Sequence, residues 1–201
     1  MIRSTEPFES ILAAMRKGAG ALKQEQVPFL LGGGLACWAR GGPPTDHDVD
    51  FLLRPEHAEA GLEALGRAGM KTERPPEHWL LKAYDEDVLV DLIFEPSGLR
   101  VDDAMFERAE ELEVRAVLMQ VASLEDVMTT KLMALTEQHL DYHSVLEIAR
   151  TLREQIDWEW VRERTSASPY AKAFFTLVEE LGIVYPRRTG SVRRIRGSRT
   201  A

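Results

Sequence analysis

The sequence is poor in cysteine, with Cys37 as the single one among 201 residues. A lone cysteine cannot form a disulfide within the chain, which fits a protein from a reducing compartment. We expect Cys37 to be an ordinary packing residue of a helix. Long apolar runs are also absent, since no stretch approaches the ~20 apolar residues needed to span a bilayer. The N-terminus lacks a basic region followed by an apolar one. We therefore expect a soluble, cytoplasmic protein with no membrane partner.

Basic residues are outnumbered by acidic ones, 25 to 33, which gives a net charge of −8. The imbalance is uneven, because segment 186–201 contains six arginines and no acidic residue. The preceding 185 residues therefore carry 19 basic and 33 acidic residues, a net charge of −14. Such a surface repels nucleic acid, whereas the arginine segment attracts phosphate. The segment is predicted to lack fixed structure, and it fits either an RNA contact or a solubilising end.

The hydrophobic pattern predicts strands and helices in the first half of the chain and helices alone in the second. A loop is expected before the last of the predicted strands, and helices continue from Ser123, which begins one as in a capping box, to Gly182. The earlier elements are expected as a helix over 8–24, a strand over 27–31, a helix to about 39, a strand around 48–53, a helix over 55–69, a hairpin of 79–84 with 88–94, and a short strand near 114–118.

This order predicts an α+β fold, in which a core with a mixed sheet is followed by a C-terminal helical lobe. We place the core at residues 1–122, the helical lobe at 123–185 and the basic segment at 186–201.

Two carboxylates share one face of a predicted strand. Asp48 and Asp50 alternate with Val49 and Phe51, and side chains in a strand alternate between its two faces. Paired carboxylates on a rigid strand suit a divalent metal, although an exposed acidic face without a metal is the equal alternative from these two residues alone.

A third carboxylate, Asp91, lies inside the apolar run Val88–Phe94. It shares its face of the predicted strand with Leu89 and Ile93, where an unpaired charge would be costly to bury. We therefore expect a metal or another cation next to Asp91.

Together these elements resemble the catalytic signature of the DNA polymerase β nucleotidyltransferase superfamily. That signature consists of a glycine pair, here Gly33 and Gly34, an Asp-x-Asp segment, and a later acid in a hydrophobic strand. The resemblance covers about residues 27–150 and implies a polymerase β-like core. It also implies an enzyme that moves a nucleoside monophosphate from an NTP, ATP among them, to an acceptor hydroxyl and releases pyrophosphate.

The resemblance assigns roles to the acids and the glycines. Two Mg²⁺ ions, or Mn²⁺ in their place, would be held by Asp48 and Asp50, and Asp91 would hold the ion that activates the nucleophile. Gly33 and Gly34 would let the triphosphate approach the backbone closely.

Four further residues are candidates for contact with the nucleotide. Lys131 and Asp141 each fall inside the apolar stripe of a predicted helix, at about 100° per residue. They could form a buried pair with each other, or Lys131 could reach the phosphates while Asp141 positions it. Thr45 precedes the Asp-x-Asp segment, and Arg40 could contact a phosphate or base or be an ordinary solvated arginine.

This Lys-then-Asp pattern, with Thr45 and Ser123, resembles the AbiEii and MenT toxins, nucleotidyltransferase-like members of bacterial toxin–antitoxin systems. The resemblance implies transfer to RNA, for MenT to the 3′ end of tRNA, and neutralisation by a partner antitoxin protein. That is our first hypothesis. The second is modification of a small molecule, because the lincosamide and aminoglycoside nucleotidyltransferases are equally similar in the Asp-x-Asp region and an acidic chain suits cationic antibiotics. The third is a nucleotide- or partner-binding module without turnover.

Overall fold

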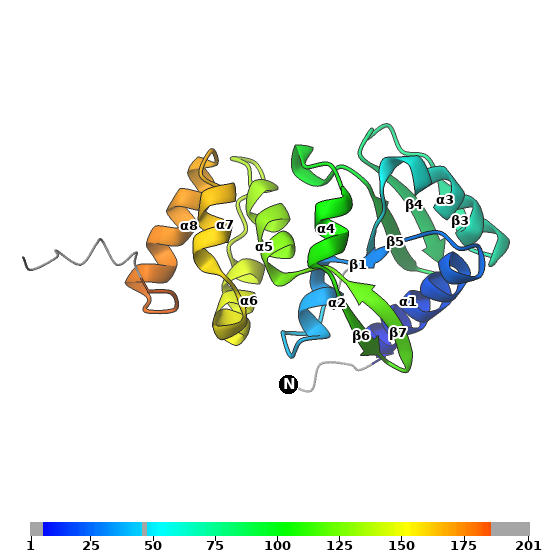
Figure 1. Cartoon of the computed structure of the whole chain (residues 1–201), viewed down its shortest axis with the longest axis horizontal. Coiled ribbons are helices and arrows are strands. Elements are labelled where there is room, and N and C mark those ends of the chain that lie inside the picture. Colours follow the sequence, from blue (N-terminus) through cyan, green and yellow to red (C-terminus); the bar gives the residue numbers. More distant parts are fainter. Residues whose placement is uncertain (1–5, 46–47, 186–201) are drawn as a thin grey trace, which may run out of the picture.

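Seven strands form one mixed sheet in the part of the chain that the computed structural model describes, residues 6–45 and 48–185. The strands follow the order β3-β4-β5-β2-β1-β7-β6 (Figure 1). β2 is parallel to β5 and antiparallel to β1, so the predicted mixed sheet is confirmed. The arginine segment 186–201 lies outside the described residues. The strands are β1 Leu30–Leu31, β2 Val49–Leu52, β3 Lys71–Glu73, β4 Leu80–Asp85, β5 Val88–Ile93, β6 Glu110–Val114 and β7 Val117–Val121.

Helices α1 (Glu6–Gln24) and α3 (Ala58–Arg67) cover one face of this sheet. Phe51 of β2 points toward α1, since a Cβ added to Gly18 would lie 2.8 Å from its ring. Leu92 of β5 points toward α3 in the same way, 3.3 Å from a Cβ added to Gly61. Because neighbouring side chains in a strand alternate, the residues just before Phe51 and Leu92 point to the opposite face.

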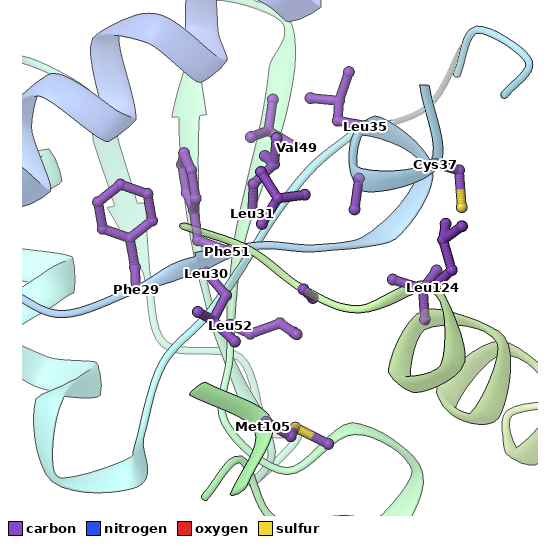
Figure 2. Close-up of a cluster of buried hydrophobic side chains, with 14 of the residues drawn as sticks. Phe29, Leu30, Leu31, Leu35, Cys37, Val49, Phe51, Leu52, Met105 and Leu124 are labelled. Atoms are coloured by element: carbon purple, nitrogen blue, oxygen red, sulfur yellow. The ribbon is translucent and has the colours of Figure 1, made fainter. Parts of the chain in front are cut away.

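After β7 the described chain is helical, and helices α5 to α8 gather at the end of the molecule away from α1 and α3 (Figure 1). Helix α5 packs against the short helix α2 (Gly33–Trp38) of the first half. Figure 2 shows that Cys37 of α2 and Leu124 of α5 belong to one buried cluster with strand residues such as Leu31 and Phe51. Within the described ranges, no helix is long and apolar enough to cross a membrane. The helices are α5 Leu124–Met133, α6 His143–Leu152, α7 Trp158–Arg164 and α8 Pro169–Glu180.

Two of the local predictions for residues 95–121 are wrong. The expected loop contains helix α4 (Asp103–Arg108), whose first turn is capped by the Asp102 carboxylate accepting from the N–H of Met105 at 3.0 Å. The expected single strand near 114–118 is the hairpin β6–β7. Its turn residues, Arg115 and Ala116, both have positive φ (50° and 63°), where glycine or asparagine is the usual signal. The sequence therefore gave no sign of a turn here.

The prediction that Asp141 lies within a helix is also wrong, because a loop separates the first two helices after residue 123. Ser123 caps α5 as expected, accepting from the N–H of Asp126 at 3.1 Å. The helix ends at Met133, because Thr136 and His139 bond to each other through their backbones in a tight loop. Helix α6 begins at His143, so Asp141 precedes it and does not occupy a helical stripe.

Candidate active site

Three carboxylates meet on the sheet face opposite α1 and α3. Asp50 of β2 pairs directly with Asp91 of β5 in the parallel register, and Asp48 stands immediately before β2. One oxygen from each of the three carboxylates lies within 4.8 Å of the other two. In the described part of the chain, no other trio of His, Cys, Asp or Glu is gathered in this way. The three acids chosen from the sequence are therefore neighbours in the fold.

Gly33 is required for this arrangement because it lies against Asp50. Its φ of +54° is in the left-handed region, and a Cβ at this position would lie 1.6 Å from Oδ2 of Asp50. The backbone N–H of Gly32 also donates to the carbonyl oxygen of Asp50 at 2.8 Å. The glycine pair was expected to admit a triphosphate. The structure adds that Gly33 makes room for a carboxylate of the site.

Burial and mutual repulsion disfavour negative charge on these acids. Burial, followed by the charge of Asp48 and then that of Asp91, raises the pKa of Asp50 to about 7, although Lys131 opposes the shift. Burial also raises the pKa of Asp91 to about 6, with Lys82 opposing and Asp48 adding to the shift. A cation between the three carboxylates would remove this cost.

The residues present fit a divalent metal. Asp91 is 7% exposed, and its Oδ1 is buried without a hydrogen-bond partner among the described residues. A buried carboxylate oxygen normally has a donor or a metal ligand bond. Hard cations such as Mg²⁺ bind carboxylate oxygens, so the orphaned oxygen and its two neighbouring acids form a suitable ligand set.

Lys82 is a site residue that the sequence reasoning missed. It stands opposite Asp91 in the β4–β5 hairpin, and its charge lowers the pKa of that acid. The signal was available, because the predicted hairpin turning at 85–87 places position 82 across from position 91.

Lys131 lines two cavities, and one of them has Asp50 of the carboxylate cluster in its wall. The larger one, here called the large cavity, has a volume of about 690 Å³ and includes Gly33, Asp50 and Ile93 in its walls. The smaller one, the small cavity, measures about 180 Å³ and is lined by Gly34 and by residues of α2 and α6. Lys131 is therefore a wall residue shared by two spaces, of which the large one borders the three carboxylates.

Of the remaining candidates, Thr45 and Asp141 lie at the small cavity, and Arg40 does not. Thr45 and Asp141 both line the small cavity with Lys131. Asp141 is exposed and accepts from the backbone N–H of His143 at 2.8 Å. Among the described residues it forms no ion pair with Lys131, so the buried-pair alternative is not observed.

Arg40 does not lie at the carboxylates. Its side chain donates to the carbonyl oxygens of Ala36 and Val121 and pairs with Glu110 at 3.2 Å. These contacts tie the end of α2 to the strands β6 and β7. Arg40 lines neither the large nor the small cavity, and its position indicates a structural role.

Comparison with known proteins places these features in a wider group. The family described as "Nucleotidyl transferase of unknown function (DUF2204)" matches residues 11–176 of the chain. No curated protein matches it in sequence.

Two solved structures of ANT(2'')-Ia are similar in fold. The crystal structure in complex with adenylyl-2''-tobramycin is 15% identical, with a TM-score of 0.59 over 81% of this chain and 98% of that one. The solution structure, described as that of an antibiotic-resistance factor, is also 15% identical, with a TM-score of 0.59 over 87% and 97% of the two chains. The predicted polymerase β-like fold with C-terminal helices is thereby confirmed.

Proposed function

The chain belongs to the DUF2204 family of nucleotidyl transferases, and from that premise we propose that Asp48, Asp50 and Asp91 carry its transfer reaction. A nucleoside monophosphate would move from an NTP to an acceptor hydroxyl. The observation that supports this assignment is the meeting of the three carboxylates within 4.8 Å, one of them with a buried, unpartnered oxygen.

In the proposed reaction the acceptor oxygen forms a bond to the α-phosphorus, the bond from that phosphorus to the bridging oxygen breaks, and pyrophosphate leaves. Two Mg²⁺ ions, or Mn²⁺, held by the three carboxylates would make the hydroxyl more acidic and neutralise charge on the phosphates. Asp48 and Asp50 would contribute to both ions. Asp91 would orient the acceptor side and take up the proton that the hydroxyl loses, as carboxylates do in general base catalysis.

Lys131 is the proposed phosphate ligand. It lines both cavities and makes no ion pair with another described residue. An unpaired lysine beside a metal site is suited to the β- and γ-phosphates of an NTP. Gly33 and Gly34 would bring the backbone close to the same phosphates, and Thr45 and Asp141 would border them in the small cavity.

The test is transfer of label from each of the four α-labelled NTPs, beginning with ATP, in the presence of Mg²⁺ and after its removal by EDTA. We expect Mg²⁺-dependent release of pyrophosphate that is lost in Asp91→Asn. Pyrophosphate release that persists in that variant would remove Asp91 from the reaction.

Two acceptors remain candidates, each with its own observation. RNA, with tRNA as the first choice, a toxin role, a partner antitoxin and a cytoplasmic location, is supported by the resemblance to AbiEii and MenT and by the six arginines of segment 186–201. A small molecule is supported by the net charge of −14 on the preceding 185 residues and by the fold shared with ANT(2'')-Ia, which was solved with an adenylylated tobramycin. In either case we propose residues 1–122 as the catalytic core and 123–185 as the helical lobe.

A further inference from the structure

Trp79 and Glu95 are held side by side at the large cavity. The carbonyl oxygen of Trp79 accepts from the backbone N–H groups of Phe94 at 3.0 Å and Glu95 at 3.2 Å. Both side chains line the cavity, and the side chain of Trp79 is 40% exposed although it is a large aromatic. An exposed tryptophan beside a carboxylate is unusual for a purely structural position.

The wall that carries Glu95 is fixed in place. Pro96 is buried, and the hydroxyl of Ser97 donates to the carbonyl oxygen of Thr130 in α5 at 3.2 Å. The turn is therefore tied to both the sheet and the helical half of the chain. The side chains of Trp79 and Glu95 are presented from a rigid frame, as a selective binding site requires.

The large cavity borders the carboxylate cluster through Asp50, which is one of its lining residues. Leu52 and Ile93, both in its wall, follow Asp50 and Asp91 by two residues on the same faces of β2 and β5. Gly33 and Lys131, which are proposed to bind the phosphates, also line the large cavity, and Gly34 and Thr45 line the small one, so the phosphates would lie where the two cavities adjoin at Lys131. Asp91 is the register partner of Asp50 and one of its oxygens lies within 4.8 Å of an oxygen of Asp50, so an acceptor hydroxyl at the Asp50 end of the large cavity would lie next to Asp91.

The charges of the large cavity do not suit a polyanion. Among its described lining residues, Lys131 is the one lysine or arginine, and the proposed function assigns it to the NTP. Arg54 and Arg100 do not line the cavity, and they are paired with Asp103 and Glu56. Binding of RNA depends on several lysines or arginines that contact successive phosphates, and the cavity wall does not offer them.

We propose that the large cavity binds the acceptor and that this acceptor is a small molecule carrying a hydroxyl and an ammonium group. The inference rests on the proposed function. The ammonium group would lie over the indole of Trp79 and pair with the carboxylate of Glu95, while the hydroxyl reaches Asp91. A volume of about 690 Å³ is within the usual range for small-molecule sites. Transfer would leave the ammonium unchanged, convert the hydroxyl into a phosphodiester and release pyrophosphate and the hydroxyl proton.

The experiment uses the full chain, Mg²⁺, α-labelled NTPs and three acceptor probes. Tobramycin is the cationic probe with hydroxyls. Maltotriose is an uncharged oligosaccharide that also carries hydroxyls, and total RNA is the polyanion. We expect label on tobramycin alone. Glu95→Gln and Trp79→Ala should each raise the KM for tobramycin about tenfold and change the KM for the NTP less than about twofold. Glu77→Gln, an exposed acid in the same segment that does not line the cavity, is the matched control.

Several results would overturn the inference while leaving the proposed function intact. They are Asp91-dependent transfer to RNA, equal transfer to maltotriose, pyrophosphate release without any label on tobramycin, and a KM for tobramycin in Glu95→Gln that equals that of Glu77→Gln. Failure of the proposed function looks different, because no NTP would then release pyrophosphate in a way that depends on Mg²⁺ and Asp91.

Discussion

At the scale of single residues, Asp91 is a buried carboxylate whose charge the described chain leaves uncompensated. It is buried in a strand between Val90 and Leu92, where an apolar residue would pack better. Its raised pKa and its unpartnered oxygen show that the folded chain alone does not compensate the charge. Such uncompensated groups concentrate at functional sites, because the missing interaction is supplied by the ligand.

Asp91→Asn is expected to abolish nucleotidyl transfer without unfolding the protein. Asparagine has nearly the same shape, but it is a poorer metal ligand and cannot take up a proton. Transfer rate and melting temperature should be measured on the same preparation. Asp87→Asn, an exposed acid at the turn of the same hairpin, should leave both unchanged. Full activity of Asp91→Asn with Mg²⁺ would refute the assignment.

Asp50→Asn is expected to stabilise the metal-free protein at pH 8 but not at pH 4. The pKa of Asp50 is about 7 in the folded chain and about 4 when unfolded, so unfolding releases a proton between these values. The wild-type chain therefore loses stability as the pH rises from about 4 to about 7, and asparagine removes that loss. Melting temperatures in EDTA at both pH values test this. Mg²⁺ should then raise the melting temperature of the wild type and not that of the variant. An equal effect of Asp50→Asn at both pH values would contradict the prediction.

Lys131→Ala is expected to weaken NTP binding strongly and to change stability only slightly. A buried ion pair with Asp141 would have made the same change cost about 3–5 kcal/mol by leaving a carboxylate unpaired. In the structure Asp141 is exposed, and its carboxylate accepts a hydrogen bond from the backbone N–H of His143, so no such loss is expected. Thermal unfolding and NTP titration on one preparation separate the two cases, with Lys172→Ala as the exposed control. A large fall in melting temperature with unchanged NTP affinity would defeat the phosphate role.

At the scale of elements, the start of α2 shapes the site through the backbone of Gly33. Gly33→Ala should reduce transfer severely, because the new Cβ would occupy the position of Oδ2 of Asp50 and displace that carboxylate. The φ of +54° adds about 1 kcal/mol of strain for alanine. Gly20→Ala in α1, where a Cβ meets nothing within 4 Å, is the control. Activity assays and near-UV circular dichroism would show whether the loss is local. A Gly33→Ala enzyme as active as the control would show that Asp50 need not stay where it is.

Elements with strong periodicity could be predicted from the sequence, and those set by tertiary context could not. The alternation around Asp50 and the apolar run around Asp91 fixed which faces carry the acids, and the β4–β5 hairpin followed from its acidic turn. The β6–β7 hairpin was not predicted, because its turn residues Arg115 and Ala116 have positive φ, a conformation that these residue types do not indicate.

The predictions that failed at the site did so for similar physical reasons. The end of α5 at Met133 depends on a loop stabilised by its own backbone bonds, so helical spacing placed Asp141 in a stripe that does not exist. Arg40 follows the helix that begins with the glycine pair, which is where a phosphate ligand was expected. Its observed partners include the carbonyl oxygen of Val121 in β7, 81 residues away in sequence. Trp79 and Glu95 are neighbours because the carbonyl oxygen of Trp79 accepts hydrogen bonds from the N–H groups of Phe94 and Glu95. No local sequence pattern predicts that these two residues line one cavity.

At the scale of the whole molecule, the two proposed substrates have opposite charges and meet an acidic protein. Residues 1–185 carry a net charge of −14, while segment 186–201 carries six arginines. A cationic acceptor is attracted to such a surface over distances of the order of the Debye length, about 10 Å at 0.1 M salt. An NTP is repelled over the same range, and in the proposed function it would depend on local contacts with the metal and Lys131.

Salt should therefore affect the two substrates in opposite directions. We expect kcat/KM for tobramycin to fall as KCl is raised, because screening weakens attraction, and kcat/KM for the Mg²⁺ complex of the NTP to stay level or rise. Deleting residues 187–201 removes all six arginines, so the slope for tobramycin should become steeper. If RNA is the acceptor, the same deletion should instead weaken RNA binding and flatten its salt dependence, since fewer counterions are released. Initial rates at a series of KCl concentrations, on the full and shortened chains, decide between the two. A kcat/KM for tobramycin that is insensitive to salt in both chains would show that the charge of the molecule plays no part in acceptor choice.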